Sequence, residues 1–238
     1  MTDLVFCIFS IRFRVINDEV LVRINKSFEF KDAHLELSSD TRAKEVVEFI
    51  GEHFFQDETL IRSLQLTFDD TVRNFCLDLL TENLSVLLIS NSTDEIIACR
   101  TLFIAKKNDT IDWSMPSNKK LGIVFTFLGH EYNKMDVFKR FGVDTAVEFF
   151  ALATHRNYRD RGIASKLMES TLLYCKELGF NPVCVQGEGT SQYSQRIFEK
   201  LGFEAIHIMK LDEYKLDGET VFKNTGDLKA VKCYVKKL

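Results

Sequence analysis

The chain has 238 residues, 45% of them hydrophobic, and a formal net charge of −4 with an isoelectric point near 5.8. This length fits one large domain, or one domain with an extension, and the hydrophobic content allows a large core. The acidic balance argues against general nucleic-acid binding, which needs an excess of Lys and Arg. Any anion that the protein binds must therefore be held locally, by a few side chains and backbone amides.

The distribution of cysteine and histidine along the chain argues against a disulfide framework and against a metal site. The six cysteines are scattered and form no CxxC pair, which predicts reduced, mostly buried thiols rather than a disulfide framework or a zinc site. The five histidines are equally dispersed, so we expect no metal. The apolar run over 4–9 is too short for a signal peptide, and no other run approaches the roughly 18 residues of a membrane span. We therefore expect a cytoplasmic protein without a membrane partner.

The first 26 residues are predicted to form an N-terminal β extension. Apolar and polar residues alternate over 9–15, which is typical of a strand with two faces. Asn17, Asp18 and Glu19 then supply a turn, so the sequence that follows predicts the second strand of a hairpin. What this extension does is left open by the sequence: it fits the edge of a sheet or a contact with a partner chain.

Residues 27–238 are predicted to form the main domain. A strand within 27–37 precedes three helices, over 41–55, from about Glu58, and over 68–83. A hairpin of two apolar strands follows over 84–105, and then a loop over 107–120 and a helical stretch to 142. The rest alternates strand and helix, with strands near 146–154, 182–187, 203–210 and 229–237 and helices near 163–179 and 192–201. This order predicts an α/β domain with a mixed sheet.

The turn in "NYRDRGIASKLMES", residues 157–170, has the chemistry of an anion site. It joins a strand that is apolar throughout, and hence buried on both faces, to an amphipathic helix. A helix N-terminus offers unpaired N–H groups, and Gly162 lets backbone approach a ligand closely. Arg159 and Arg161 add positive charge, and no acidic cap competes for the amides. The alternative is a plain turn with two solvated arginines.

This stretch resembles motif A of the GNAT-type N-acetyltransferases, whose Arg/Gln-x-x-Gly-x-Gly/Ala loop cradles the pyrophosphate of acetyl-CoA. The segment "SQRIFEKLGFEAIHIMKL" resembles motif B of the same superfamily. The resemblance implies a mixed, mainly antiparallel sheet flanked by helices, with acetyl-CoA as cosubstrate. It places the pyrophosphate at the turn and the pantetheine arm on a splayed strand. The cofactor-binding residues it implies are Leu152, Ala153, Thr154, Arg159, Asp160, Arg161, Gly162, Ile163, Ala164 and Ser165.

Residues 27–238 resemble, more narrowly, the arylalkylamine (dopamine-type) N-acetyltransferases of invertebrates. The motifs that carry this are "FFQDETL", "THRNYRDRGIASKL" and "YSQRIFEKLGFEAIHIMKLDEYKLDGETVFK". Asp160 and Ser165 stand where the relatives have glycine, which reduces backbone freedom at the turn. Thr59 replaces a proline of the relatives.

The same resemblance implies the residues of the reaction. The general base is carried onto Glu58, whose ordinary pKa of about 4.3 must be raised by burial or assisted by water for it to act on an ammonium group. Two hydroxyls are carried onto Thr190 and Ser194, and we assign to Ser194 the protonation of the thiolate. Each has a purely structural alternative: a solvated carboxylate for Glu58 and helix capping for the hydroxyls.

Other candidates are weaker. Phe198 occupies the place of the tyrosine acid found in many GNAT enzymes, with Tyr193 as a less favoured substitute. His155 and His207 fit structural positions, and Cys175 and Cys184 fit the core. Phe54 and Phe55 are expected to wall an aromatic amine pocket.

The function that the resemblance implies is direct acetyl transfer from acetyl-CoA to a small arylalkylamine of the dopamine, serotonin, octopamine or tryptamine type. Two alternatives stay open: acetylation of polyamines or peptide amines, and a non-catalytic module that binds acyl-CoA. We expect a monomer, with no nucleic-acid partner.

Overall fold

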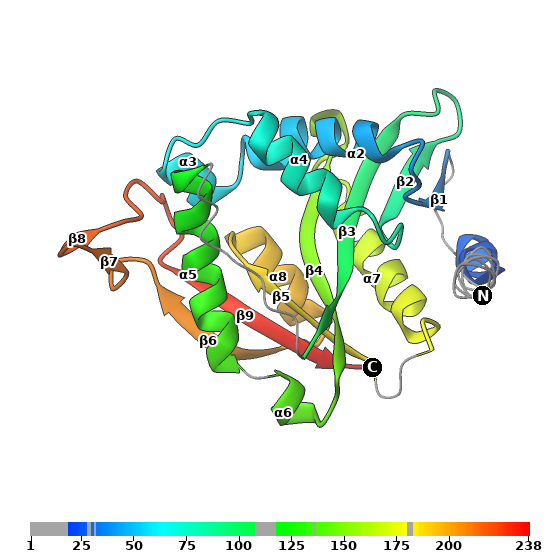
Figure 1. Ribbon diagram of the computed structural model, residues 1–238. Helices are drawn as coiled ribbons and strands as arrows, with labels where there is room; N and C mark the ends of the chain where they lie inside the picture. The colour runs from blue at the N-terminus through cyan, green and yellow to red at the C-terminus, as the bar shows by residue number, and fades with distance from the viewer. Residues whose placement is uncertain (1–18, 28–29, 31, 108–117, 136, 180–182) are drawn as a thin grey trace, which may run out of the picture.

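The computed structural model describes residues 19–27, 30, 32–107, 118–135, 137–179 and 183–238 (Figure 1). Seven strands form one sheet in the order β1-β2-β3-β4-β5-β9-β6. Only β4 and β5 run parallel, and every other neighbouring pair is antiparallel. The strands are β1 (Ala33–Leu37), β2 (Val86–Ser90), β3 (Ile96–Lys106), β4 (Thr145–Thr154), β5 (Cys184–Gly189), β6 (Glu204–Lys210) and β9 (Ala230–Lys237). The predicted mixed, mainly antiparallel sheet is confirmed.

Helices cover both faces of this sheet. They are α2 (Ala43–Ile50), α3 (Thr59–Ser63), α4 (Asp70–Leu79), α5 (Lys119–Met135), α6 (Val137–Phe141), α7 (Ile163–Lys176) and α8 (Gln192–Lys200). A π-helical turn, η1 (Gly51–Phe55), continues α2, and a 3₁₀ turn, η2 (Arg156–Tyr158), follows β4. Strand β2 shows the two layers, since Leu88 packs into the core with α7 whereas Leu87 packs into the core with α2 and α4.

The predicted second strand of the N-terminal hairpin is wrong, because residues 19–27 are helical. Val20 and Ile24 fit one face of a strand and one face of a helix equally well. The structure buries Val20, Leu21 and Ile24 against the sheet and leaves Val22 54% exposed, as helical spacing requires. The strand predicted over 9–15 lies outside the described residues.

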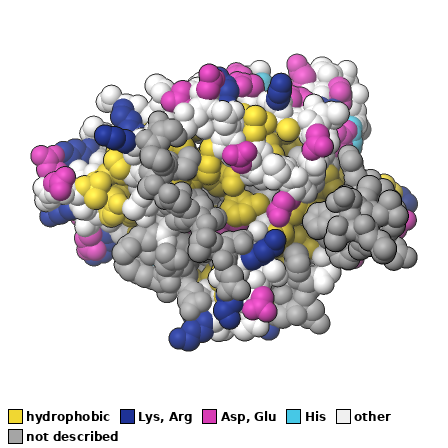
Figure 2. All heavy atoms as spheres, in the orientation of Figure 1, with side chains coloured by type: hydrophobic (Ala, Val, Ile, Leu, Met, Phe, Trp, Pro, Cys, Tyr) yellow, Lys and Arg dark blue, Asp and Glu magenta, His cyan; other side chains and the backbone are white. Residues whose placement is uncertain are grey.

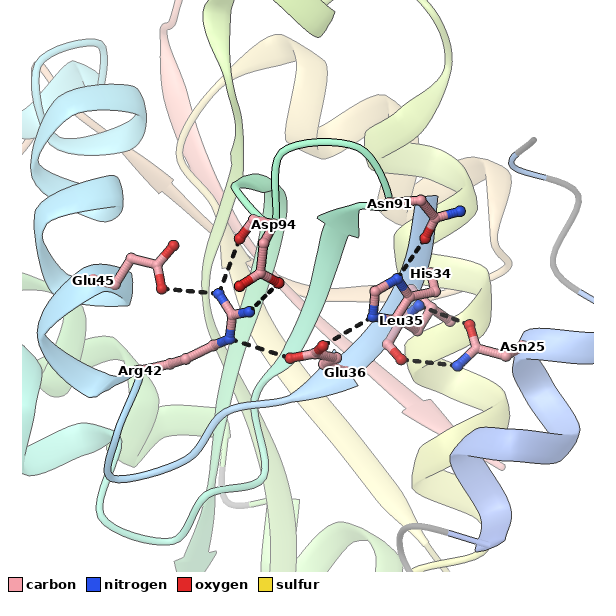
Figure 3. Close-up of polar contacts among 8 residues, drawn as sticks. All are labelled: Asn25, His34, Leu35, Glu36, Arg42, Glu45, Asn91 and Asp94. Carbon is pink, nitrogen blue, oxygen red and sulfur yellow. Dashed lines mark hydrogen bonds and ion pairs between the residues drawn. The ribbon is translucent and has the colours of Figure 1, made fainter. Parts of the chain in front are cut away.

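This N-terminal helix also covers the edge of the sheet (Figure 3). The Asn25 side-chain amide donates to the Leu35 carbonyl at 2.8 Å and accepts from the Leu35 N–H at 2.7 Å. The amide thereby occupies backbone groups of β1 that would otherwise stay open on an edge strand. Figure 3 also shows Arg42, the residue just before α2, which forms ion pairs with Glu36 of β1 and with Asp94.

Most other elements match their predictions, and a short hairpin of β7 (Lys215–Leu216) and β8 (Glu219–Thr220) was not predicted. The five described cysteines are buried thiols, as expected. Among the described residues, no helix is both long and apolar enough to cross a bilayer.

Candidate active site

The parallel strands β4 and β5 separate partway along the sheet. Their last paired residues are Phe149 and Gly187, after which β4 runs on to Thr154. A Cβ atom at Gly187 would lie 2.8 Å from the Phe149 carbonyl oxygen, so this close approach requires glycine. A register shift between β3 and β4 accompanies the separation, and the buried Thr101 hydroxyl accepts the Ala151 N–H there at 2.8 Å. The gap opens between two otherwise continuous strands.

The end of β4 is consequently paired on one side only. Leu152, Ala153 and Thr154 pair with Arg100, Cys99 and Ala98 of β3. No described residue of β5 pairs with these three. The side of this backbone that faces β5 therefore has no ladder partner among the described residues, whereas the side chain of Ala153 is buried in the core with α2 and α4.

A cavity of about 740 Å³ starts at this gap and extends between helices from both sides of the sheet. Hydrophobic side chains gather on one face of the molecule around α2 and β4 (Figure 2). Most predicted site residues line the cavity: Phe54, Phe55, Glu58, Leu152, Thr154, Arg159, Asp160, Gly162, Ile163, Ala164, Ser165, Thr190 and Ser194. Arg161 is not among its lining residues, because its guanidinium donates to the Asn157 carbonyl at 3.0 Å and lies over Tyr158.

The N-terminus of α7 forms one wall. Gly162 is the N-cap residue with φ +73°, no side chain caps the helix, and its first turn holds no acidic residue. In the first hydrogen bond of the helix, the Lys166 N–H donates to the Gly162 carbonyl at 3.1 Å. The amides of residues 163–165 therefore have no partner inside the helix, which leaves them available to an anion.

The Arg159 side chain contacts the segment before α3 rather than the first turn of α7. Its guanidinium donates to the His53 carbonyl at 2.7 Å and forms an ion pair of 2.8 Å with Asp57. Arg156 also contacts Asp57. These contacts join the α7 turn to the segment that precedes α3, and they neutralise Asp57, the acidic neighbour of Glu58.

Glu58 is the N-cap residue of α3 and points one oxygen at its own helix. Oε2 accepts the Ile61 N–H at 2.7 Å, whereas Oε1 is buried without a hydrogen-bond partner of standard geometry among the described residues. Burial raises the pKa of Glu58 to about 7, against the opposing effects of the Ile61 N–H and the Thr190 hydroxyl. A carboxylate with this pKa can take up a proton near neutral pH.

The hydroxyls at the start of α8 have a structural role as well. Ser191, not Thr190, is the N-cap residue, and its hydroxyl accepts the Ser194 N–H at 3.1 Å. The Ser194 hydroxyl accepts the Ser191 N–H at 3.2 Å in return, which completes a capping box. Tyr193 lies at the cavity rim with its side chain 77% exposed.

Sequence reasoning missed an aromatic wall of this cavity. Phe75 of α4, Phe125 of α5 and Phe150 of β4 lie together, with centroid distances of 4.7 Å for Phe75–Phe125 and 6.2 Å for Phe125–Phe150. Each looks like an ordinary core residue in its own segment. It also missed Arg100 and Glu188, which line the cavity near the strand gap.

Neither His155 nor His207 is among the residues that line this cavity. His155 accepts the Asn157 N–H on Nδ1 and packs against His53 with ring centroids 4.3 Å apart. His207, on β6, is not among the residues that line the cavity. Both observations agree with structural roles.

Known proteins match a large part of this chain. Residues 64–203 match the family described as "Acetyltransferase (GNAT) family". The structure of arylalkylamine N-acetyltransferase 2 from Aedes aegypti is 25% identical, with a TM-score of 0.80 over 86% of this chain and 98% of that one. A polyamine N-acetyltransferase of Drosophila melanogaster is 18% identical, with a TM-score of 0.74 over 87% of this chain and all 100% of that one. The family match spans more than half of the sequence, and the chain belongs to the GNAT acetyltransferase family.

Proposed function

We propose that this protein transfers the acetyl group of acetyl-CoA to the primary amine of a small arylalkylamine. One observation carries the proposal: a single cavity joins the free amides of α7, the gap between β4 and β5, the buried Glu58 carboxylate and an aromatic wall. GNAT acetyltransferases use acetyl-CoA, so the acetyl donor follows from the family. The acceptor and the roles of individual residues are the proposed part.

The residues present fit acetyl-CoA. The amides of residues 163–165 would hold the pyrophosphate, since Gly162 has no Cβ and no acidic residue stands in the first turn of α7. The open side of the β4 backbone at Leu152–Thr154 would hold the amide groups of the pantetheine arm by extending the sheet. Arg159 would contribute by fixing the turn through His53 and Asp57 rather than by direct contact.

Glu58 would act as the general base. An alkylammonium group has a pKa of about 10, so it must lose a proton before its nitrogen can attack the thioester. The raised pKa of Glu58 brings its proton affinity closer to that of the amine, and among the described residues its Oε1 atom has no hydrogen-bond partner of standard geometry. Thr190 lies beside this carboxylate and would orient it or a water molecule. Ser194 would give a proton to the departing thiolate.

The walls favour an aryl amine over a polyamine. Phe75, Phe125 and Phe150 offer ring faces and edges to a planar ring. A polyamine carries several cations and needs several free carboxylates. Of the four described carboxylates that line the cavity, Asp57 is paired with Arg156 and Arg159, and Asp160 belongs to the α7 turn. Glu58 is the proposed base, which leaves Glu188 for a second cation. Polyamine and agmatine acetyltransferases are nevertheless among the structural neighbours, which makes polyamines the second candidate.

A substrate panel tests the proposal. Thiol release from acetyl-CoA would be measured with tyramine, dopamine, serotonin, spermidine and a peptide amine. We expect turnover with the aryl amines, with a KM that rises at least tenfold in Phe150→Ala. Phe103→Ala is the matched control, because Phe103 is also a half-buried strand residue but does not line the cavity. Turnover with spermidine or the peptide alone would contradict the substrate class. Acetyl-CoA binding without turnover on any amine would contradict the enzymatic role.

A further inference from the structure

Arg100 is a buried cation at the point where β4 leaves β5. It lies in the middle of β3, opposite Leu152, and is only 3% exposed. It nevertheless lines the cavity. A guanidinium in this position is costly, because a buried charge is normally paired and hydrogen-bonded.

The described residues around Arg100 do not satisfy the hydrogen-bonding capacity of its guanidinium. Its Nε and Nη2 atoms have no hydrogen-bond partner among the described residues. The guanidinium carbon lies 4.2 Å from the centre of the Phe149 ring and 5.8 Å from that of Phe198. Glu148 and Glu188 act on it electrostatically, yet burial outweighs them and lowers the pKa of Arg100 to about 9. An anion that enters the cavity would supply the missing partner.

Phe198 indicates which anion this is. In the motif B resemblance, Phe198 stands where many GNAT enzymes have a tyrosine acid, and it is 2% exposed and stacked on Tyr234. A phenyl ring cannot protonate a leaving group. Instead, the Phe198 ring lies at this position with its face toward the nearby Arg100 guanidinium.

We propose that Arg100 stabilises the sulfur of coenzyme A as a thiolate until Ser194 gives it a proton, and so provides by charge part of what a tyrosine acid at the position of Phe198 would provide by proton transfer. This inference rests on the proposed function. In the reaction, the bond from the amine nitrogen to the carbonyl carbon forms, the carbon–sulfur bond breaks, and its electron pair stays on sulfur. The ammonium loses two protons in all, one through Glu58 to solvent and one that ends on the sulfur. Arg100 lowers the free energy of the sulfur anion before that second proton arrives.

The test measures the thiol of bound coenzyme A rather than turnover. Thiolate absorbance in the ultraviolet gives the pKa of that thiol, which is about 8.5 for an ordinary free thiol. In the wild-type complex we expect a pKa lowered by at least one unit. In Arg100→Met, which keeps a long unbranched side chain without the charge, we expect the ordinary value or a higher one. Arg100→Lys should give an intermediate value. Equal thiol pKa values in the wild-type protein and Arg100→Met would overturn the inference.

A second measurement needs only the wild-type protein, in case the variants fail to fold. Binding of coenzyme A is compared with binding of its desulfo analogue between pH 6 and pH 9. We expect the ratio of the two affinities to grow at least fivefold in favour of coenzyme A over this range, since only coenzyme A has a thiol that ionises. A constant ratio would overturn the role of Arg100 while leaving the proposed function intact. Failure of both molecules to bind would instead defeat the proposed function, and this inference with it.

Discussion

Asp160 and Gly162 flank Arg161, and both have positive φ angles, +61° and +73°. The turn that precedes α7 thus needs two left-handed residues, of which only one is a glycine. A left-handed conformation costs a residue with a Cβ roughly 1 kcal/mol, and Asp bears this cost better than most. A glycine at position 160 would adopt this conformation without that cost.

Substituting Gly162 should impair coenzyme binding as well as stability. Gly162→Ala places a Cβ in a left-handed residue and should cost about 1 kcal/mol of unfolding free energy. Gly179→Ala is the matched control, since Gly179 has φ +82° and equally open space around it but lies beyond the far end of α7. We expect both variants to lose similar stability in urea unfolding, and only Gly162→Ala to bind acetyl-CoA more weakly by calorimetry. Equal affinities would place the anion elsewhere.

Replacing Asp160 with glycine should have the opposite effect. The change removes backbone strain and a negative charge from the cavity wall, so Asp160→Gly should gain up to about 1 kcal/mol in stability and bind acetyl-CoA more tightly. Asp217 offers the control, because it has φ +52° and lies in the β7–β8 turn. Asp217→Gly should gain comparable stability and leave the coenzyme affinity unchanged. A weaker affinity in Asp160→Gly would show that the carboxylate serves the site.

Glu58 should make stability depend on pH. Its folded pKa of about 7 lies above the ordinary value of 4.5, so the folded state holds this proton more tightly than the unfolded state does. The resulting stability is fully present below pH 4.5 and is lost as pH rises through 7, a change of about 3 kcal/mol. Glu58→Gln lacks this dependence and keeps an acceptor for the Ile61 N–H. The stability of this variant relative to wild type should therefore grow between pH 4.5 and pH 8.

Glu52→Gln supplies the comparison for that measurement, because the Glu52 side chain is 67% exposed on the turn just before Glu58. Its stability relative to wild type should stay flat over the same pH range. A flat difference for Glu58→Gln as well would mean that its carboxylate is not buried as the structure places it.

Variants of Ser191 and Ser194, at the start of α8, distinguish a helix-capping role from a role in proton transfer. Ser191→Ala removes the N-cap acceptor and Ser194→Ala the return bond, so each should lower stability by about 1 kcal/mol. If Ser194 gives a proton to the thiolate, Ser194→Ala should also lower kcat on the order of 100-fold. Ser191→Ala should leave kcat near the wild-type value. Matching kcat values in the two variants would restrict Ser194 to its capping role.

Local patterns predicted much of the fold and the turn that forms one wall of the cavity. The turn before α7 follows from its own residues, since the apolar strand, the glycine and the absent acidic cap are all adjacent in sequence. The aromatic wall could not be predicted, because Phe75, Phe125 and Phe150 look like core residues until α4, α5 and β4 meet. Arg100 gives no local signal either, as its environment is made by Phe149 and Phe198 from distant segments.

The N-terminal helix shows a different limit. Val20, Val22 and Ile24 alternate as a strand would, and Val20, Leu21 and Ile24 fit a helix face as well. Contacts with the sheet favour the helix. A helix buries Val20, Leu21 and Ile24 in the core together, and it places Asn25 where its amide bonds the Leu35 backbone on the edge strand β1.

The pH dependence of kcat/KM for an aryl amine, measured in wild type and in Glu58→Gln, tests the central claim most directly. We predict that the wild-type value rises with pH through a pKa of about 7, the value that burial gives Glu58. Glu58→Gln should lose this dependence and on the order of 100-fold in rate, with acetyl-CoA affinity unchanged. A wild-type profile without a step near pH 7, shared by Glu58→Gln at a similar rate, would contradict the assignment of Glu58 as the base.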